Sequence, residues 1–345
     1  MTTRYTLGLF ANMYPAFEGD YRGSFISQMV RDLEFRNITV KKAVKTSSSV
    51  TGYIPFFWDS LRLARDEELD LIQAEYIPHS SIIPAFTKRN DVPLVLKFHG
   101  DDARIFPFRN RINMMLTRSM ISRASHIITA SEEMRQIIIG LGSSSSQVTA
   151  IHTGVDTDFF VPRARENSRE ELQIKSDELI FLFAGRLHPS KGIGEIIEVA
   201  LLCPQATFVF LGPGKIPVHP KNCSFMGIKN HEDVRTWLNA SDCLILPTHT
   251  EAIPTSVMEA FSCGIPAITS NIGGCPEIVD DMETGLLVPP RDVPALRDAV
   301  LWMAENPGKR RAMGERARKE VLRRFDHNTL TDKLVRVHRM LIDRK

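Results

Sequence analysis

The chain has 345 residues, of which 43% are hydrophobic and 24% charged, and its formal net charge is +2. This length favours two domains over one, and the nearly balanced charge excludes a protein built to bind nucleic acid. The sequence has no apolar run near the roughly 18 residues of a membrane span, and its first apolar run is too short for a signal peptide. We therefore expect a cytoplasmic protein.

The first half begins with an apolar run at residues 5–10 that is typical of a buried strand. A loop containing Gly19 follows, and then a helix in which Phe25, Met29 and Leu33 recur at helical spacing. A glycine-containing loop between the first strand and the first helix is where a doubly wound domain places its ligand. The GxGxxG pattern of dinucleotide-binding proteins is absent. The loop is therefore either a binding loop or a plain surface turn.

Three further buried strands are expected at residues 70–74, 93–98 and 125–130. The second of them ends in His99 and Gly100, so His99 is placed to reach a ligand at the carboxyl end of a sheet. A hydrogen-bonded loop residue is the alternative for a single histidine. The neighbouring Asp101 and Asp102 make an incomplete metal site. We predict no bound metal.

The segment 104–123 mixes apolar side chains with four arginines after Arg104, namely Arg109, Arg111, Arg118 and Arg123. A basic and apolar segment of this kind is typical of a peripheral contact with an anionic membrane at the inner face of the cell membrane. The alternative is an ordinary amphipathic helix with one solvated face. Both interpretations stay open at the level of the sequence.

A charged stretch at residues 162–176 is the best candidate for a linker between two domains. We expect an N-terminal domain at 1–160, a C-terminal domain at 161–325 and a last helix at 326–345 that packs on the first domain. The Asp156-Thr157-Asp158 triplet matches the DxD pattern of metal-dependent sugar transferases. Because it lies at the domain junction, we interpret it as structural. The five cysteines lack a CxxC pair, which indicates buried free thiols in a reducing compartment.

The second domain restarts the alternation of strand and helix at residues 178–185. Arg186 and Lys191 follow on either side of a turn before the next helix, where two cations can neutralise a diphosphate. After a strand at 207–211 comes Gly212, which lets the backbone approach a ligand closely. Met226, further on, is a candidate wall for a base pocket.

The segment 248–266 is expected to be a loop and a helix between two buried strands. Pro254 opens this helix, and the free N–H groups of Thr255 and Ser256 suit a phosphate. Glu251 in the loop and Glu259 in the helix would then accept hydrogen bonds from hydroxyl groups. The alternative is that Ser256 and Glu259 form a capping box with no role in binding.

The order of these segments resembles the retaining glycosyltransferases of glycosyltransferase family 4, which have the GT-B fold and use nucleotide sugars. The strongest pieces are Gly185-Arg186-Leu187 with Lys191-Gly192, and the E-x7-E spacing from Glu251 to Glu259. The supporting pieces are His99-Gly100, Gly154-Val155-Asp156, Gly212-Pro213-Gly214 and Gly274 to Glu277. The resemblance implies two Rossmann-like doubly wound domains that face each other across a cleft.

The resemblance also implies roles for single residues. Arg186 and Lys191 would hold the donor diphosphate, Glu251 the hydroxyls of the donor sugar, and Glu259 the ribose diol. His99 would face the transferred sugar, and the loop around Gly19 would lie by the diphosphate. The family commonly has two glycines in that loop, whereas Gly19 is followed by aspartate here.

We therefore expect a metal-independent retaining hexosyltransferase that moves a sugar from a nucleoside diphosphate donor to a glycan or lipid-linked acceptor, in cell-surface polysaccharide or glycolipid biosynthesis. A UDP-sugar is favoured over a GDP-sugar as the donor. The alternatives are a GT-B sugar-nucleotide epimerase or phosphorylase, and a non-catalytic protein that binds nucleotide sugars. The sugar, the base and the acceptor depend on pocket residues outside the motifs.

Overall fold

The computed structural model describes residues 4–17, 23–216 and 219–344. The chain divides into two compact units, unit 1 with residues Met1–Thr153 and His327–Lys345, and unit 2 with residues Gly154–Asp326. Unit 1 therefore combines the start of the chain with its last helix. The sequence analysis placed the limits at 1–160, 161–325 and 326–345, whereas the compact units change between residues 153 and 154 and between 326 and 327.

Unit 1 is built on a parallel six-stranded sheet in the order β2-β1-β3-β4-β5-β6. The sequence-based strands at 5–10, 70–74, 93–98 and 125–130 are β1, β3, β4 and β5. The strands are β1 (Thr6–Ala11), β2 (Thr39–Val44), β3 (Leu71–Glu75), β4 (Leu94–Phe98), β5 (His126–Thr129) and β6 (Val148–Ala150). The helices are α1 (Ser24–Phe35), η1 (Val50–Gly52), α2 (Tyr53–Ala64), α3 (Ile82–Thr87), α4 (Asp101–Arg104), η2 (Phe106–Phe108), α5 (Arg111–Arg123), α6 (Glu132–Gly140), η3 (Ser145–Gln147) and α14 (His327–Ile342).

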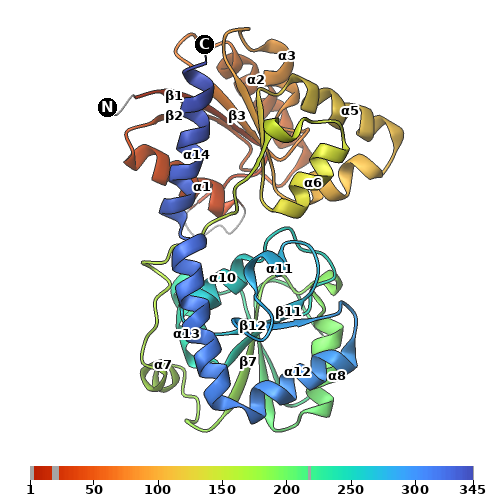
Figure 1. Ribbon diagram of the computed structural model, residues 1–345, viewed down its shortest axis with the longest axis vertical. Helices are drawn as coiled ribbons and strands as arrows, with labels where there is room; N and C mark the ends of the chain where they lie inside the picture. Colours follow the sequence, from red (N-terminus) through yellow and green to blue (C-terminus); the bar gives the residue numbers. More distant parts are fainter. Residues whose placement is uncertain (1–3, 18–22, 217–218, 345) are drawn as a thin grey trace. The chain divides into compact units, whose positions relative to one another are not determined.

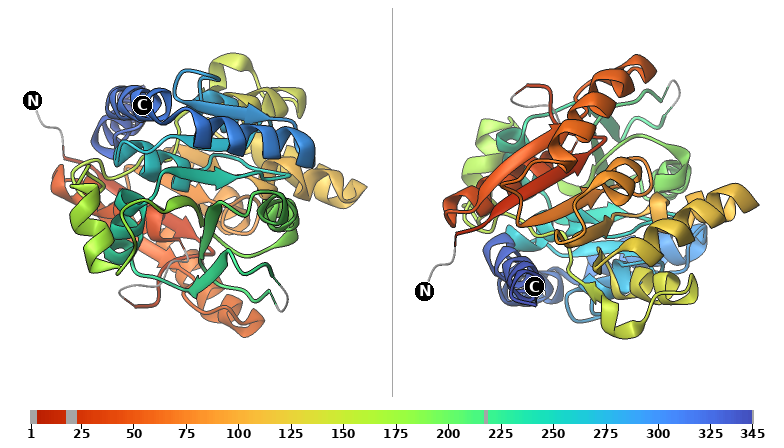
Figure 2. Two further views of the ribbon diagram at one scale, coloured as in Figure 1. Left: turned by 90° about the horizontal axis from the view of Figure 1, so that it is seen from below. Right: turned by 90° about the horizontal axis from the view of Figure 1, so that it is seen from above.

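Helices cover both faces of the unit 1 sheet (Figure 2). The connection through α1 runs from β1 to an outer strand, and the later connections run the other way, so right-handed crossovers place α1 on the face opposite α2, α3, α5 and α6. The C-terminal helix α14 packs beside α1 (Figure 1), and its Leu330, Leu334 and Leu341 join the same core as Ile26 and Leu33. The last helix is thus an integral part of unit 1.

Unit 2 repeats the architecture with a second parallel sheet in the order β12-β11-β10-β7-β8-β9. Its strands β7, β8, β10 and β11 coincide with the predicted apolar runs. The strands are β7 (Leu179–Ala184), β8 (Ala206–Leu211), β9 (Cys223–Gly227), β10 (Cys243–Leu246), β11 (Ala267–Ser270) and β12 (Gly285–Val288). The helices are α7 (Arg165–Glu171), η4 (Pro189–Lys191), α8 (Ile193–Leu202), α9 (His231–Ala240), α10 (Thr255–Ser262), α11 (Cys275–Ile278), α12 (Val293–Glu305) and α13 (Pro307–Arg324).

Two parallel sheets covered by helices make the fold class α/β, with two Rossmann-like domains, as the sequence predicted. All five cysteines are buried with free thiols. No helix in the described part of the chain is both long and apolar enough to cross a membrane. In Asp156-Thr157-Asp158, Asp156 Oδ1 accepts the backbone N–H groups of Asp158 (3.1 Å) and Phe159 (2.8 Å), which fixes a turn.

Candidate functional site

The strand order of the unit 2 sheet reverses between β7 and β10. From β7 the chain moves outward through β8 and β9, and it then returns to the other side of β7 to lay down β10, β11 and β12. Ligands of open parallel sheets bind beyond the carboxyl ends of the strands at such a switch point. The loop after β7 carries Arg186 and Lys191, and the loop after β10 carries Glu251. The topology therefore brings together residues that are 60 positions or more apart in the sequence.

Lys191 and Glu251 are in direct contact across this switch point. The Lys191 Nζ lies 2.6 Å from Glu251 Oε2, and the two side chains keep 26% and 14% of their surface exposed. A cation that suits a phosphate and a carboxylate that suits hydroxyl groups therefore occupy one place. In the absence of a ligand they neutralise each other.

Backbone contacts hold the two loops against each other. The His249 N–H donates to the Ser190 carbonyl oxygen (2.8 Å), and the Thr248 hydroxyl contacts the same oxygen at 3.1 Å. At the start of α8, Glu195 Oε1 lies 2.6 Å from His249 Nε2. Neither Glu195 nor His249 belongs to a motif recognised in the sequence. A histidine in the loop that follows the end of β10 was the signal that could have found the second of them.

Two glycines permit the close approach of backbone segments at this edge. Gly192 has a φ of 73°, and a Cβ placed on it would lie 2.0 Å from the Pro247 carbonyl oxygen. Gly212 has a φ of 135°, and its Cβ would lie 1.9 Å from the Gly185 carbonyl oxygen. Any side chain at either position would push the loop away from its neighbour. Gly212 thus packs directly against Gly185, the residue before Arg186.

Arg186 is an exposed cation at the end of β7. Its loop is fixed by a hydrogen bond from the Leu187 N–H to the Pro213 carbonyl oxygen (2.8 Å). Unlike Lys191, Arg186 forms no ion pair with any residue that the structure describes. Met226, near the end of β9, keeps 38% of its surface exposed. Both residues lie at the carboxyl edge of the sheet.

The first residues of helix α10 do not form the capping box that was the alternative interpretation. Pro254 is its N-cap residue, no side chain caps it, and Thr255 and Ser256 occupy its first turn. Glu259 lies one turn further in, so the Ser256–Glu259 capping box is wrong. Burial raises the pKa of the Glu259 carboxyl to about 7. Its carboxylate has no hydrogen bond to another described residue, and its residue surface is still partly exposed.

We expect Glu259→Gln to stabilise the ligand-free protein above neutral pH. The raised pKa means that the folded protein keeps a proton that the unfolded chain releases, so Glu259 lowers stability as the pH rises from about 4.5 to about 7. The full penalty is at most about 3.5 kcal/mol at about pH 8, because one pKa unit corresponds to about 1.4 kcal/mol. Thermal unfolding of both proteins across this pH range measures the gain. Glu305→Gln, at an exposed carboxyl, should show none, and an equal gain in both variants would contradict the assignment.

Two of the cavities that described residues line lie at the switch point of the unit 1 sheet, between β1 and β3. One, of about 230 Å³, is lined by Asn12, Tyr14, Lys45 and Tyr76, among others. The other, of about 200 Å³, is lined by Asn12, Tyr76, Ile77, His79, Asp101, Asp102, Phe106 and Arg109. Both lie at the carboxyl edge of the strands. The predicted binding residue Gly19 lies outside the described residues.

The His99 imidazole points into unit 1. Only 5% of the side chain is exposed, and its ring lies between Tyr76 (centroids 4.5 Å apart) and Phe25 (5.0 Å). Its Nε2 contacts a carboxylate oxygen of the fully buried Glu75. The surface that His99 presents is therefore mainly backbone. The sequence could place His99 at the strand end but could not show that its ring turns inward.

Asp102 shapes the turn after β4. Its carboxylate accepts the backbone N–H groups of Ile77 (3.1 Å), His99 (3.0 Å) and Gly100 (2.8 Å). These bonds explain why an acidic residue is buried at this position. In residues 4–17, 23–216 and 219–344 there is no cluster of three potential metal-binding side chains.

A chain of buried hydrogen bonds runs from Glu75 to the last helix. Gln73 donates an N–H to Glu75, and its Oε1 lies 2.7 Å from His338 Nε2, whose other ring nitrogen lies 2.8 Å from the Tyr5 hydroxyl. Burial opposes the charge of Glu75, but nearby Lys97 and the hydrogen bonds of His99 and Gln73 outweigh it and lower the Glu75 pKa to about 2. Glu75 is therefore ionised at neutral pH.

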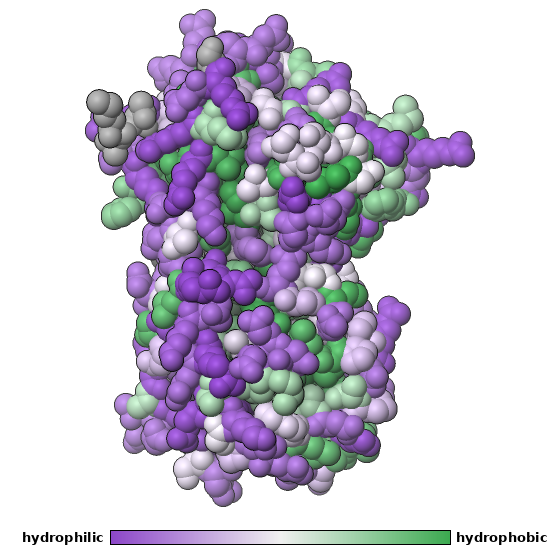
Figure 3. Space-filling model, viewed as in Figure 1, coloured by the Kyte–Doolittle hydropathy of each residue, from purple (hydrophilic) through white to green (hydrophobic). Residues whose placement is uncertain are grey.

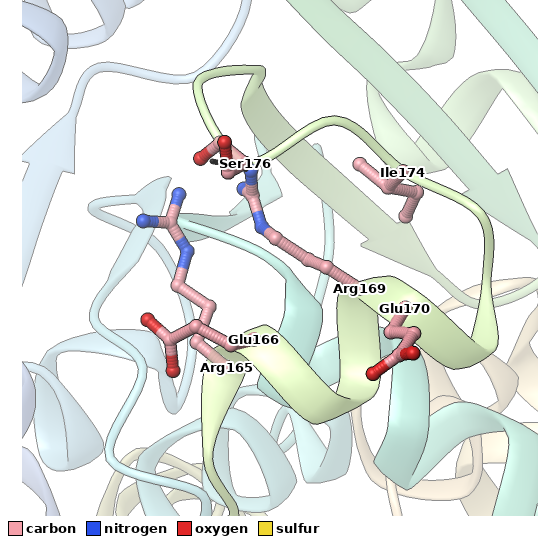
Figure 4. Close-up of a pocket in the computed structure, with 6 residues that line it drawn as sticks. All are labelled: Arg165, Glu166, Arg169, Glu170, Ile174 and Ser176. Atoms are coloured by element: carbon pink, nitrogen blue, oxygen red, sulfur yellow. Dashed lines mark hydrogen bonds between the residues drawn. The ribbon is translucent and has the colours of Figure 1, made fainter.

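A third cavity, of about 160 Å³, lies beside α7 in unit 2 (Figure 4). Arg165 and Arg169 from its wall reach Asp242, at 2.6 Å and 3.1 Å, and Arg310 reaches the same carboxylate at 2.8 Å. Asp242 directly precedes β10, so this cluster is at the amino end of the strands. It ties α7 and α13 to the sheet and lies at the edge opposite Lys191 and Glu251.

Comparisons with known proteins identify the family of this chain. Residues 164–320 match the family model "Glycosyl transferases group 1", and residues 21–159 match "Glycosyltransferase Family 4". The two models together cover most of both units. This chain belongs to the GT-B glycosyltransferases of the family 4 and group 1 type, which confirms the resemblance found in the sequence.

Individual relatives and structures extend the comparison. The putative teichuronic acid biosynthesis glycosyltransferase TuaC of Bacillus subtilis is 29% identical over 68% of this chain, and the match spans 61% of that protein. Sucrose-phosphate synthase from Thermosynechococcus elongatus has the same fold, with a TM-score of 0.82, 18% identity and coverage of 99% of this chain and 100% of that one. Anabaena HepE in complex with UDP-glucose gives a TM-score of 0.76, 19% identity and coverage of 96% and 98%.

Proposed function

We propose that this protein is a retaining glycosyltransferase that transfers a sugar from a nucleoside diphosphate donor to a glycan or lipid-linked acceptor, in cell-surface polysaccharide or glycolipid biosynthesis. The observation that carries the proposal is the contact of Lys191 with Glu251 at the switch point of the unit 2 sheet. One group suits a diphosphate and the other suits sugar hydroxyls, so the pair fits a ligand that has both.

The reaction breaks the bond between the donor sugar and its diphosphate, and negative charge develops on the departing phosphate. Arg186 and Lys191 would stabilise that charge, together with the free N–H groups of Thr255 and Ser256 at the start of α10. We propose that these groups act without a bound metal. Transfer that persists with excess EDTA would support this step, and transfer that EDTA abolishes would contradict it.

The remaining donor contacts follow from the same edge of the sheet. Glu251, released from Lys191, would accept hydrogen bonds from the sugar, and Glu259 would accept them from the ribose diol. Gly212 and Met226 would lie beside the diphosphate and the base. A UDP-sugar is the favoured donor, and the UDP-glucose complex of Anabaena HepE supports this choice. The cavities of unit 1, near His99, would take the acceptor.

The experiment is a thermal-shift panel of nucleoside diphosphates and their sugars. A ligand that binds only the folded protein raises the unfolding temperature by mass action. We expect a UDP-sugar to raise it more than a GDP-sugar or either free nucleotide. A panel without any stabilising nucleotide would refute the proposal.

The donor found in this way then serves in transfer assays with candidate acceptors. Proton NMR of the product gives the anomeric configuration, and retention is the expected outcome. Incubation of donor without acceptor separates the alternatives, because an epimerase would still change the sugar, and a phosphorylase would require inorganic phosphate.

A further inference from the structure

Unit 1 exposes large apolar side chains on one group of helices. Among the described residues, all those it exposes except Phe17 and Phe35 lie between residues 50 and 116. We call the central part of this region the apolar surface, defined by Ile54, Phe57 and Trp58 of α2, Phe86 of α3, and Ile112 and Met115 of α5. Exposed patches of this kind mark interaction sites more often than chance positions do.

Helix α2 is apolar on two sides. Phe56 and Leu63 face the interior and are buried. Ile54, Phe57, Trp58 and Leu61 are spaced i, i+3, i+4 and i+7, so they form a second stripe on the other side, where Trp58 keeps 63% of its surface exposed. A helix that is apolar all round normally has partners all round. In the described chain, the outer stripe of α2 leaves Ile54, Phe57 and Trp58 exposed.

Helices α3 and α5 continue this surface. Helix α3 packs against both α2 and α5, and the Arg123 guanidinium of α5 lies 4.3 Å from the centre of the Phe86 ring. On α5, Ile112 and Met115 keep 69% and 70% of their surface exposed. Figure 3 shows apolar residues at the surface over α3 and α5. The surface therefore spans three neighbouring helices.

The charges on these helices indicate the nature of the partner. Helix α5 carries Arg111, Arg118 and Arg123 and no acidic residue, and α2 carries only Asp59 and Arg62. Apolar and aromatic side chains with a basic rim are typical of helices that lie in the interface of an anionic bilayer. A second copy of the chain would bring the same arginines against one another, which is unfavourable.

We propose that the apolar surface docks unit 1 on an anionic lipid bilayer. The sequence placed such a contact in residues 104–123, but Met120 and Ile121 in that segment are buried, and α2, outside it, supplies Trp58. The docking surface thus comes from helices that are separate in the sequence and adjacent in the fold.

The surface also adjoins the second cavity of unit 1. Phe106 and Arg109 line that cavity, and Phe108 between them keeps 58% of its surface exposed. Docking would therefore bring the cavity to the bilayer and Arg109 near lipid phosphates. If unit 1 binds the acceptor, as the proposed function holds, this placement favours an acceptor that is anchored in the membrane and carries an anionic head group.

The experiment is flotation of the full chain with vesicles of equal parts phosphatidylglycerol and phosphatidylcholine at low salt, beside vesicles of phosphatidylcholine alone. We expect co-migration with the anionic vesicles and much less with the neutral ones. The double variant Phe57→Ser with Trp58→Ser should lose binding by at least about tenfold, because the apolar contact area is removed. The matched control is Leu201→Ser with Leu202→Ser on α8, where both leucines are exposed. It should float like the wild type.

Thermal unfolding checks that each variant is folded. If the α2 variant does not fold, the double variant Ile112→Ser with Met115→Ser on α5 replaces it in the flotation test. Wild-type protein that stays with neither vesicle, or α2 and control variants that float equally, would overturn the proposal. So would a dimer in light scattering that only the α2 variant abolishes, because the surface would then bind a second copy. The thermal shift with nucleotide sugars should be the same in all variants, so this test can fail without the proposed function failing.

Discussion

Arg186→Ala is expected to lower kcat/KM for sugar transfer by about 100- to 1000-fold, the usual effect of removing one fixed donor from a developing negative charge. Arg186 lies at the carboxyl end of β7, beside the switch point, and it has no ion pair in the described part of the chain. Its removal therefore leaves no buried partner behind. The folded state should keep its stability while the reaction slows.

The comparison with Arg186→Lys tests the geometry of the contact. Lysine restores the charge but not the planar pair of donors that a guanidinium offers to a phosphate, so recovery should be partial. Arg311→Ala, at an exposed arginine of α13, is the control and should keep wild-type activity. Initial rates over a range of donor concentrations separate kcat from KM. Wild-type rates in Arg186→Ala would remove Arg186 from the mechanism.

Glu75→Gln is expected to destabilise unit 1 by about 3 kcal/mol, because breaking a buried ion pair leaves the partner charge uncompensated. Glu75 is fully buried, it contacts the His99 ring, and Lys97 is close enough to lower its pKa to about 2. The amide of glutamine can keep the hydrogen bonds but not the charge. Lys97 would then lose the carboxylate that balances its charge.

The stability difference between the wild type and Glu75→Gln should depend on pH. Because the Glu75 pKa is lower in the folded state than the ordinary value of 4.5, its contribution is fully present above about pH 4.5 and is lost as the pH falls toward about 2. The wild type and the variant should therefore converge in stability in acid. Glu67→Gln, at an exposed carboxyl, serves as the control in urea unfolding. A Glu75→Gln protein as stable as the wild type at neutral pH would contradict the role of the charge.

The sequence was sufficient to locate the edge of unit 2 that carries the proposed donor-binding residues. Apolar runs followed by glycine and charge predicted strands that end in polar loops, and the parallel alternation put all these loops at one edge. Lys191 and Glu251 could be assigned to that edge without coordinates. Their direct contact depends on the strand order, in which β10 lies next to β7, and local patterns do not encode strand order.

The sequence could not reveal the interior polar contacts of unit 1. The hydrogen bond of Tyr5 with His338 joins residues 333 positions apart, and that of Gln73 with His338 joins residues 265 apart. No spacing rule covers such distances. For the same reason His99 could be placed at the end of β4, whereas the inward turn of its ring toward Glu75 required the packed fold.

The outer stripe of α2 was missed for a different reason. Ile54, Phe57 and Trp58 lie beside the buried Phe56 along the chain, so residues 53–58 look uniformly apolar. Uniform apolarity predicts burial on every side. Only the folded structure separates the side of α2 that packs from the side that is exposed.

The ion pair of Lys191 and Glu251 has a consequence for selectivity. A free diphosphate could draw Lys191 away, but Glu251 would then lose its partner and gain no hydroxyl in return, which is costly for a half-buried carboxylate. A free sugar could approach Glu251 only by competing with the ammonium group. A molecule that carries phosphate and sugar together would satisfy both groups at once. If the proposed function holds, the pair would therefore favour the intact donor over either of its halves alone.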